Sequence, residues 1–321
     1  GCIYKGLRPV YWCPSCETAL AEAEIEYMED RTQSIYVKFA VKDDKGKLKG
    51  IVDSLDNTYV VIWTTTTWTL PGNVAICLNP DFTYVVVKAG NENYIMAREL
   101  AENTMKAAGI ENYEIIGEIK GADLEYVVCR HPFLDRDSLV ITGDHVTLDA
   151  GTGCVHTAPG HGVEDFEVCK KYEGLEVVVP VDGKGYLTKE AGQFAGLKYD
   201  QANKEIFKYL KETGALFADQ VIEHQYPHCW RCREPILFRA TEQWFISVDS
   251  FKDETLKAIR EVKWIPEWGE ERISKMVQER TGWCISRQRL WGVPIPIFYC
   301  TECGKELING ETIEAVKKLF E

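Results

Sequence analysis

The sequence predicts an α+β fold, in which a β-barrel-like unit stands on a base held together by a metal ion. Two observations lead to this prediction. Many short segments rich in Val, Ile, Thr and Tyr are separated by turns that contain Gly or Asn, whereas few segments show helical periodicity. In addition, several of the 12 cysteines form C-x-x-C pairs that stand far apart in the chain.

The length and the charge limit the class of protein. A chain of 321 residues can form two or three domains with a large buried core. The net charge of −13 argues against a nucleic-acid-binding surface over the whole chain. No apolar run is long enough to span a membrane, so we expect a soluble, cytoplasmic protein without membrane contact. Because the sequence begins with neither Met nor a signal segment, we expect a piece of a longer chain.

Strands predominate between the first and the second cysteine pair. The expected strands are 34–41, 58–66, 83–88, 93–96, 125–129, 138–142 and 153–157. The expected helices are 97–108, 163–172 and 200–211. After residue 232 the pattern changes, and the expected elements are a strand at 237–245 and helices at about 250–260 and 269–279.

A threonine-rich stretch at the end of one of these strands is the first candidate site. The apolar run 59–62 leads into the threonines 64–67, and Pro, Gly and Asn within 70–73 favour a turn soon afterwards. Alternate side chains of a strand share a face, so Thr64 and Thr66 point one way and the other two threonines the opposite way. Two hydroxyls beside an indole can bind a polar group, although threonine and tryptophan in a strand are also ordinary core residues.

A second candidate stretch, 151–166, combines a short strand, a Gly/Pro turn and the start of a helix. Asp165 falls in the first helical turn, where exposed backbone amides favour a carboxylate. His156 ends the strand on the same face as Cys154. The turn brings a His and an Asp together, which indicates a polar site; a histidine by itself is more often structural.

The cysteine pattern indicates a metal site and not disulfides. The C-x-x-C pairs are Cys13 and Cys16, Cys229 and Cys232, and Cys300 and Cys303. Two such pairs supply the four thiolates of a tetrahedral structural zinc site. Closing a loop of about 210 residues costs about 5 kcal/mol, whereas a structural zinc ion contributes roughly 10–16 kcal/mol in small model systems. A redox C-x-x-C is the alternative, but it requires a βαβ context that none of the pairs shows.

Together, these segments resemble the editing domain, or connective peptide 1, of the isoleucyl-tRNA synthetases, which are class I enzymes. The family's threonine strand reads W-T-T-T-P-W-T-L-P-x-N, and its second segment reads G-T-G-x-V-H-x-A-P-x-H-G-x-x-D. Both occur here, at 63–73 and 151–165, in the family's order. The valyl and leucyl relatives carry an arginine-containing T-T-R-P sequence instead. One position departs from the pattern: Thr67 replaces a proline, which would fix φ at the exit of the strand.

The resemblance implies a division into four parts. These are a zinc-ribbon-like entry segment at 1–32, the editing domain at 33–222, the returning zinc-ribbon half with the exit strand at 223–250, and a helical connection with a partial α/β segment of the catalytic core at 251–321. The adenylate-forming signatures H-I-G-H and K-M-S-K-S are absent. The chain is therefore not expected to aminoacylate, and ATP is expected only in the intact parent enzyme.

The resemblance also assigns the cysteines. In the family, Y-W-C-P-x-C enters the insertion and C-W-x-C leaves it, which joins Cys13 and Cys16 to Cys229 and Cys232 in one zinc site. Cys300 and Cys303 would form half of a second site, which in the family is completed by two cysteines further along the chain.

The activity implied by the resemblance is hydrolysis of valine misattached to the 3′ end of isoleucine tRNA. This family is the established example of the problem, because a pocket separates isoleucine from valine by only about 1–3 kcal/mol and a second pocket must exclude the larger side chain. The expected partners are this tRNA end and the missing parts of the parent chain, with no protein partner evident. The candidates for catalysis are Asp165 for the α-ammonium group, Thr65, and His156; those for substrate binding are Thr64, Thr66 and Asn73 around the ester and side chain and Trp68 against the adenosine.

Several alternatives stay open at this point. His156 shapes the pocket in the first interpretation and is a general base in the second. A zinc-stapled RNA-binding module without catalysis would use a basic stretch at 272–289, which is equally explained by a solvated helix face and a core strand. A freestanding editing hydrolase that acts in trans is the third possibility.

Overall fold

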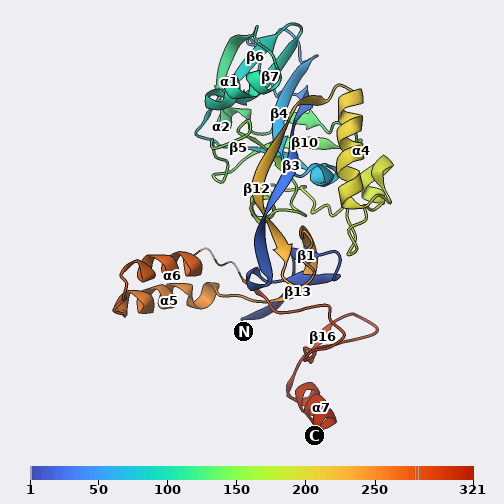
Figure 1. Cartoon of the computed structure of the whole chain (residues 1–321), viewed down its shortest axis with the longest axis vertical. Coiled ribbons are helices and arrows are strands. Elements are labelled where there is room, and N and C mark those ends of the chain that lie inside the picture. Colours follow the sequence, from blue (N-terminus) through green and yellow to red (C-terminus); the bar gives the residue numbers. More distant parts are fainter. Residues whose placement is uncertain (1, 279, 281) are drawn as a thin grey trace.

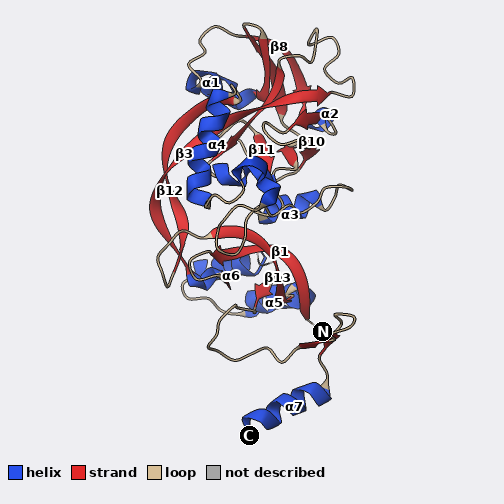
Figure 2. Cartoon of the chain, turned by 90° about the vertical axis from the view of Figure 1, so that its right-hand side faces the viewer, coloured by secondary structure: helices blue, strands red, loops and turns tan. Residues whose placement is uncertain are grey.

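The computed structural model describes residues 2–278, 280 and 282–321. The molecule is elongated: a large sheet with its helices lies at one end, a smaller sheet lies below it, and the last helices extend beyond the smaller sheet (Figure 1). Figure 2 shows the same arrangement from the side, with α4 against the large sheet and α7 at the opposite end. None of the helices among the described residues is long and apolar enough to cross a membrane.

The large sheet mixes parallel and antiparallel pairs. Its strand order is β12-β3-β9-β10-β5-β11-β4-β7-β6-β8, and β3 pairs with β4 as well. The strand pairing can therefore be followed from β3 through β9, β10, β5, β11 and β4 back to β3. These six strands form a closed ring. The strands are β3 (Ile25–Asp43), β4 (Thr58–Thr64), β5 (Ala75–Leu78), β6 (Thr83–Ala89), β7 (Glu92–Ala97), β8 (Glu114–Lys120), β9 (Val128–Arg130), β10 (Asp137–Thr142), β11 (Cys154–Thr157) and β12 (Leu216–Cys229).

The alternation of side chains along the ring strands divides the core into two clusters. On β3, Ile35, Val37 and Phe39 are fully buried in the main cluster, whereas Tyr36 between them belongs to the second cluster on the other face. Strand β4 shows the same alternation. Each fully buried side chain of this kind contributes roughly 1.5–3 kcal/mol to folding, so the register of these strands is strongly fixed.

A long two-stranded ribbon joins the ring to the smaller sheet. Strands β3 and β12 pair antiparallel from Ile25 opposite Cys229 to Val37 opposite Leu216. The expected boundaries after residues 32 and 222 fall inside β3 and β12. Both strands run without a break from the lower part of the molecule into the ring (Figure 1).

The smaller sheet, called the base from here on, has the order β14-β13-β1-β2. Its strands are β1 (Ile3–Cys13), β2 (Thr18–Leu20), β13 (Leu237–Ile246) and β14 (Trp283–Cys284). The pairing of β1 with β13 runs from Ile3 opposite Ile246 to Trp12 opposite Leu237. The first and last thirds of the chain therefore meet in the base.

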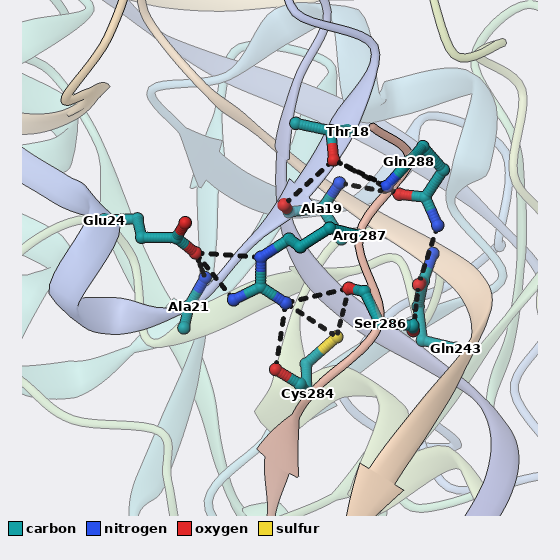
Figure 3. A network of polar contacts seen from close by, with 9 residues as sticks. All are labelled: Thr18, Ala19, Ala21, Glu24, Gln243, Cys284, Ser286, Arg287 and Gln288. Atoms are coloured by element: carbon teal, nitrogen blue, oxygen red, sulfur yellow. Dashed lines mark hydrogen bonds and ion pairs between the residues drawn. The ribbon is translucent and has the colours of Figure 1, made fainter. Parts of the chain in front are cut away.

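The segment after β14 is bound to the base by polar contacts (Figure 3). The Arg287 guanidinium donates to Glu24 Oε2 at 2.9 and 2.6 Å, and Gln288 Oε1 accepts the N–H of Ala19 at 3.0 Å. The Ser286 hydroxyl donates to Gln243 Oε1 on β13 at 2.5 Å. Most of these groups are partly buried, so the contacts fix residues 284–288 on the base.

The helices lie outside both sheets. The α-helices are α1 (Arg98–Ala107), α2 (Gly121–Leu124), α3 (Val163–Cys169), α4 (Tyr199–Glu212), α5 (Asp249–Glu261), α6 (Trp268–Gln278) and α7 (Gly310–Phe320). Short 3₁₀ helices are η1 (Glu22–Glu24), η2 (Thr67–Gly72) and η3 (Lys189–Phe194), and β15 (Phe298–Tyr299) pairs with β16 (Glu306–Leu307) in a hairpin. Helices α5 and α6 pack against each other beside the base (Figure 1).

The structure confirms the mixed α and β character and most of the expected elements. The strands expected at 83–88, 93–96, 138–142 and 153–157 and the helices at 97–108, 200–211 and 250–260 agree with the observed elements within about two residues. The strand at 237–245 also agrees. The helix expected at 269–279 is α6, and residue 279 lies outside the described residues.

Other predictions were inaccurate for local reasons. The strand expected to reach Thr66 ends at Thr64, because the Thr64 hydroxyl accepts the N–H of Thr66 and turns the chain. The helix expected to reach residue 172 ends at Cys169, where the next turns form i to i−3 hydrogen bonds. The strand expected at 125–129 is β9, which begins at Val128 because Tyr126 adopts a left-handed conformation with φ 69°.

Candidate functional site

A cavity of about 320 Å³ lies between the ring and the base. Four parts of the chain form its wall: the end of β4 with η2, the end of β11 with the following loop, α3, and the strands β12 and β13. The lining residues are Thr64, Thr65, Thr66, Trp68, Thr69, His156, Ala158, His161, Asp165, His224, Tyr226 and Phe238. The two candidate stretches of the sequence therefore meet at one place.

The threonine turn is held from several sides. Thr66 precedes η2, and Asn203 on α4 accepts the N–H of Trp68 at 2.8 Å. At the other end of η2, His131 donates to the carbonyl of Leu70 at 2.8 Å, and Arg136 donates to the carbonyl of Pro71 at 2.8 Å. Because these end groups of the helix are satisfied, the threonines in front of it have a fixed backbone.

His156 is neutral and has a defined tautomer. The amide nitrogen of Asn73 donates to the carbonyl of Ala75 and to His156 Nδ1, both at 2.8 Å, so Nδ1 is an acceptor. His156 Nε2 therefore carries the proton and donates to the Thr69 hydroxyl at 3.1 Å, and this hydroxyl donates to the carbonyl of Thr66 at 2.7 Å. Burial, followed by the charges of His131 and His161, lowers the pKa of His156 to about 3.

Asp165 lies in the first turn of α3, as the sequence predicts. Its Oδ2 accepts the N–H of Ala158 at 2.9 Å. Burial raises the pKa of Asp165 to about 6, although the Ala158 hydrogen bond opposes this shift. A Cβ atom on Gly162 would lie 2.9 Å from Asp165 Oδ2, so the residue before α3 leaves room for the carboxylate only because it is glycine.

Trp68 and His161 pack edge to face at the side of the cavity. Their ring centroids are 4.8 Å apart at an interplanar angle of 76°, and Tyr199 packs on Trp68 at 6.2 Å. Trp68 is only 3% exposed. His161 Nδ1 donates to the carbonyl of Phe238 on β13 at 2.8 Å, and burial lowers the pKa of His161 to about 4.

Most residues predicted from the sequence lie at the cavity, but one does not line it. Thr64, Thr65, Thr66, Trp68, His156 and Asp165 line the cavity together. Asn73 is fully buried behind His156, and its Oδ1 accepts the Ser138 hydroxyl at 2.7 Å. Its contacts fix His156 and do not reach the cavity.

Several residues that line the cavity were not predicted as site residues. His161 and Thr69 stand inside the two motifs, so the motifs could have identified them as site residues. His224 and Tyr226 on β12 and Phe238 on β13 have no such signal, because only the tertiary arrangement of the ribbon and base brings them to the threonines.

Four cysteines that fit a metal ion lie where β1 of the base meets the end of β12. The Sγ atoms of Cys13, Cys16, Cys229 and Cys232 lie within 4.8 Å of one another. The N–H of Cys16 donates to Cys13 Sγ at 3.3 Å, which is an interaction that favours a thiolate. Glu17 and Arg233, which follow the two pairs, both have positive φ values, of 51° and 64°. Two matching turns thus present four sulfur ligands, the donor set typical of structural zinc.

The third cysteine pair has a similar turn without further ligands. Gly304 after Cys303 has φ 69°, and its N–H donates to the carbonyl of Cys300 at 2.9 Å, as Arg233 does to Cys229 at 2.8 Å. Within the part of the chain that the structure describes, no third or fourth metal-binding side chain joins Cys300 and Cys303.

Comparison with known proteins defines the class to which this fold and site belong. The chain belongs to the class I tRNA synthetases (I, L, M and V), whose family model matches residues 1–321. Within this class, isoleucine–tRNA ligase from Caldicellulosiruptor bescii is 65% identical over 321 residues, which are 100% of this chain and 35% of that protein. Isoleucine–tRNA ligase from Thermoanaerobacter sp. is 64% identical over 320 residues, or 34% of its length. The chain thus spans about a third of the curated relatives it matches, and the resemblance to isoleucyl-tRNA synthetases is confirmed.

Two solved structures show similarity to part of this chain. The crystal structure of GlLeuRS-CP1 has a TM-score of 0.47 and 16% identity, and covers 58% of this chain and 99% of its own. The editing domain of the P. knowlesi cytosolic leucyl-tRNA synthetase has a TM-score of 0.46 and 13% identity, and covers 60% of this chain and 98% of its own.

Proposed function

We propose that this chain is the editing part of an isoleucyl-tRNA synthetase and that its cavity hydrolyses valine misattached to the 3′ end of isoleucine tRNA. One observation carries this proposal: the threonine turn and the separate segment that holds His156 and Asp165 line the same cavity. The cavity thus combines hydroxyls with a carboxylate, the groups that this proposal assigns to the ester and to the α-ammonium group.

The proposed roles follow from the contacts. Asp165 is the one carboxylate that lines the cavity among the described residues, and it attracts the α-ammonium group of the ester. Thr64, Thr65 and Thr66 bind the ester and orient the attacking water, which is sufficient because an aminoacyl ester is already reactive. His156 and Thr66 limit the space for the amino-acid side chain. His156 is not proposed as the base, because its Nδ1 already accepts a hydrogen bond and its pKa is about 3.

The four cysteines of the base are proposed to bind one zinc ion. Zinc would supply no chemistry at the cavity and would join the turn between β1 and β2 to the end of β12. Binding of ATP, together with formation of the aminoacyl adenylate, is proposed for the whole synthetase and not for this chain.

An RNA-binding module without catalysis has less support from the structure. Three of the five basic residues between 272 and 289 are in ion pairs: Lys275 with Glu271 at 2.6 Å, Arg280 with Glu22 at 3.6 Å and Arg287 with Glu24 at 2.6 Å. The Arg287 pair is partly buried, whereas the other two pairs are more exposed. This charge is therefore used largely within the chain.

The test is deacylation of valyl-tRNA(Ile) and isoleucyl-tRNA(Ile) by this chain at high concentration under single-turnover conditions. We expect release of valine at least about ten times faster than release of isoleucine, the lower limit for one methylene. Asp165→Ala should abolish the reaction and keep the cooperative melting transition. If the wild-type chain binds tRNA but releases neither amino acid, the binding-module alternative replaces this proposal.

A further inference from the structure

The Asp165 loop, residues 158–162, leads into α3 and is bound to the edge of β13 that faces away from β1, ahead of the residues that pair with β14. One edge of β13 pairs with β1, and the N–H of Ala240 points away from β1 to the carbonyl of Gly160 at 2.7 Å. On the same edge, the carbonyl of Phe238 accepts a hydrogen bond from His161 Nδ1 at 2.8 Å. The imidazole N–H thus takes the place that a backbone N–H of a neighbouring strand would occupy.

His161 is also locked in place from its other sides. Its ring packs edge to face on Trp68. A Cβ atom on Gly72 would lie 3.0 Å from His161 Cδ2, so η2 closes tightly over the ring. His161 Nε2 is buried and has no hydrogen-bond partner among the described residues, so the Nδ1 hydrogen bond is the polar contact that orients the ring.

The position of His161 determines the position of Asp165 through a short chain of contacts. The N–H of His161 donates to the carbonyl of Ala158 at 2.8 Å, and the N–H of Ala158 donates to Asp165 Oδ2 at 2.9 Å. The intervening Gly160 has no space for a side chain, because its Cβ would lie 2.2 Å from the carbonyl oxygen of Val178. A displacement of His161 therefore passes to Asp165 with little room for compensation.

We propose that His161 is a positioning residue that fixes the Asp165 loop on strand β13 and thereby sets the place of the carboxylate in the cavity. The expected effect on deacylation rests on the proposed function. The expected effect on the position of the loop does not. Strand β13 also binds the segment 284–288 through Gln243 (Figure 3), so one strand connects that segment with the site loop.

Three substitutions separate the N–H donor of His161 from its ring. His161→Asn keeps a donor close to the place of Nδ1 but loses the ring. His161→Phe keeps a ring against Trp68 but loses the donor, and His161→Gln moves the donor to the place of Nε2. His228→Phe is the matched control, because His228 Nδ1 donates to the carbonyl of Tyr226 at 2.9 Å and His228 does not line the cavity.

The experiment measures two quantities for each variant: single-turnover deacylation of valyl-tRNA(Ile), and hydrogen exchange of the Ala158 amide, whose partner is Asp165. For His161→Phe and His161→Gln we expect the maximal rate to fall about a hundredfold, with little change in half-saturating concentration, because the loss is one of alignment. The Ala158 amide should exchange about tenfold faster. His161→Asn should restore both quantities to near the wild-type values, and His228→Phe should change neither.

Two results would overturn the inference. One is wild-type exchange and rate in His161→Phe, and the other is equal impairment of the Asn and Gln variants, since then the donor has no special role. If His161→Phe lacks a cooperative melting transition, it is not folded and its rate is not informative. The comparison of the Asn and Gln variants then tests the inference. If the wild-type chain does not deacylate, the proposed function fails, but the exchange of the Ala158 amide still tests whether His161 positions the loop.

Discussion

Asp165 combines a requirement for charge with an environment that disfavours charge. Burial raises its pKa to about 6, so at neutral pH the carboxylate is ionised at a cost in stability. Between pH of about 4 and 6 the folded protein holds a proton that the unfolded chain has already released. Stability therefore decreases as pH rises through this window, and the wild-type protein loses stability in forming the charge that its proposed substrate needs.

The first prediction concerns this residue. Asp165→Asn should remove deacylation at every pH, while raising the free energy of unfolding near pH 8 by about 1–3 kcal/mol and by much less near pH 4. The wild-type deacylation rate should rise with pH through about 6, where Asp165 ionises. Urea denaturation at the two pH values and a pH–rate profile measure these effects. A destabilised Asn variant would instead make Asp165 a structural residue.

His156 provides the second prediction, because it determines the size of the proposed side-chain pocket. His156→Ala removes a ring from the cavity wall, and isoleucyl-tRNA(Ile) should become a substrate. One additional CH₂ group corresponds to about 1 kcal/mol plus relieved overlap, so discrimination should fall by about one to two powers of ten.

The two deacylation rates under single-turnover conditions check this prediction. Thr69 and Asn73 lose their common partner in the variant, so its melting temperature is measured in parallel. An equal loss of rate on both substrates would show that His156 takes part in the reaction itself and is no sieve.

At the scale of elements, the turn from β4 into η2 explains how the chain accommodates Thr67, where the family pattern quoted in the sequence analysis has proline. Thr67 is the first residue of η2, where a backbone N–H has no helical partner and proline is accepted. Thr66 before it has φ −124° and ψ 82°, outside the helical region that a following proline disfavours.

Thr67→Pro should therefore leave the fold and the deacylation rate almost unchanged. The free energy of unfolding should stay within about 1 kcal/mol of wild type or rise by a few tenths, since proline restricts the unfolded chain. Thermal melting and deacylation of valyl-tRNA(Ile) test this expectation. A loss of several kcal/mol would mean that the N–H or the hydroxyl of Thr67 is needed.

The elements also show what sequence patterns can and cannot predict. Strands such as β6 and β10 were predicted because their own residues carry the β-branched pattern. β1 and β12 were not predicted, since their many polar and exposed positions are stabilised by pairing with distant strands. The same difference applies to the site: Asp165 and Thr64 stand in local motifs, whereas His224 reaches the cavity only through the ribbon.

At the scale of the whole molecule, the cysteines of the base join segments that are more than 200 residues apart, Cys13 with Cys16 and Cys229 with Cys232. We predict one tightly bound zinc ion per chain. Cys13→Ala should lose this ion and melt at a clearly lower temperature, because a structural zinc ion contributes roughly 10 kcal/mol in small model systems.

Metal analysis and thermal melting check the zinc prediction. Cys303→Ala is the control and should keep both the zinc content and the melting temperature, since its pair lacks two ligands among the described residues. An unchanged zinc content in Cys13→Ala would contradict the assignment.

The ribbon of β3 and β12 has a mechanical consequence. His224 lies five residues from Cys229 along β12, a distance of about 17 Å in a strand. Because His224 and Tyr226 line the cavity from β12, a rotation of the ribbon at the base would move one wall of the cavity. A tilt of about five degrees at the base moves His224 by about 1.5 Å, which is about the length of one carbon–carbon bond. The side chains of valine and isoleucine differ by one methylene group. In the proposed function, the rigidity of the ribbon where it meets the base therefore determines how accurately the cavity discriminates between the two amino acids.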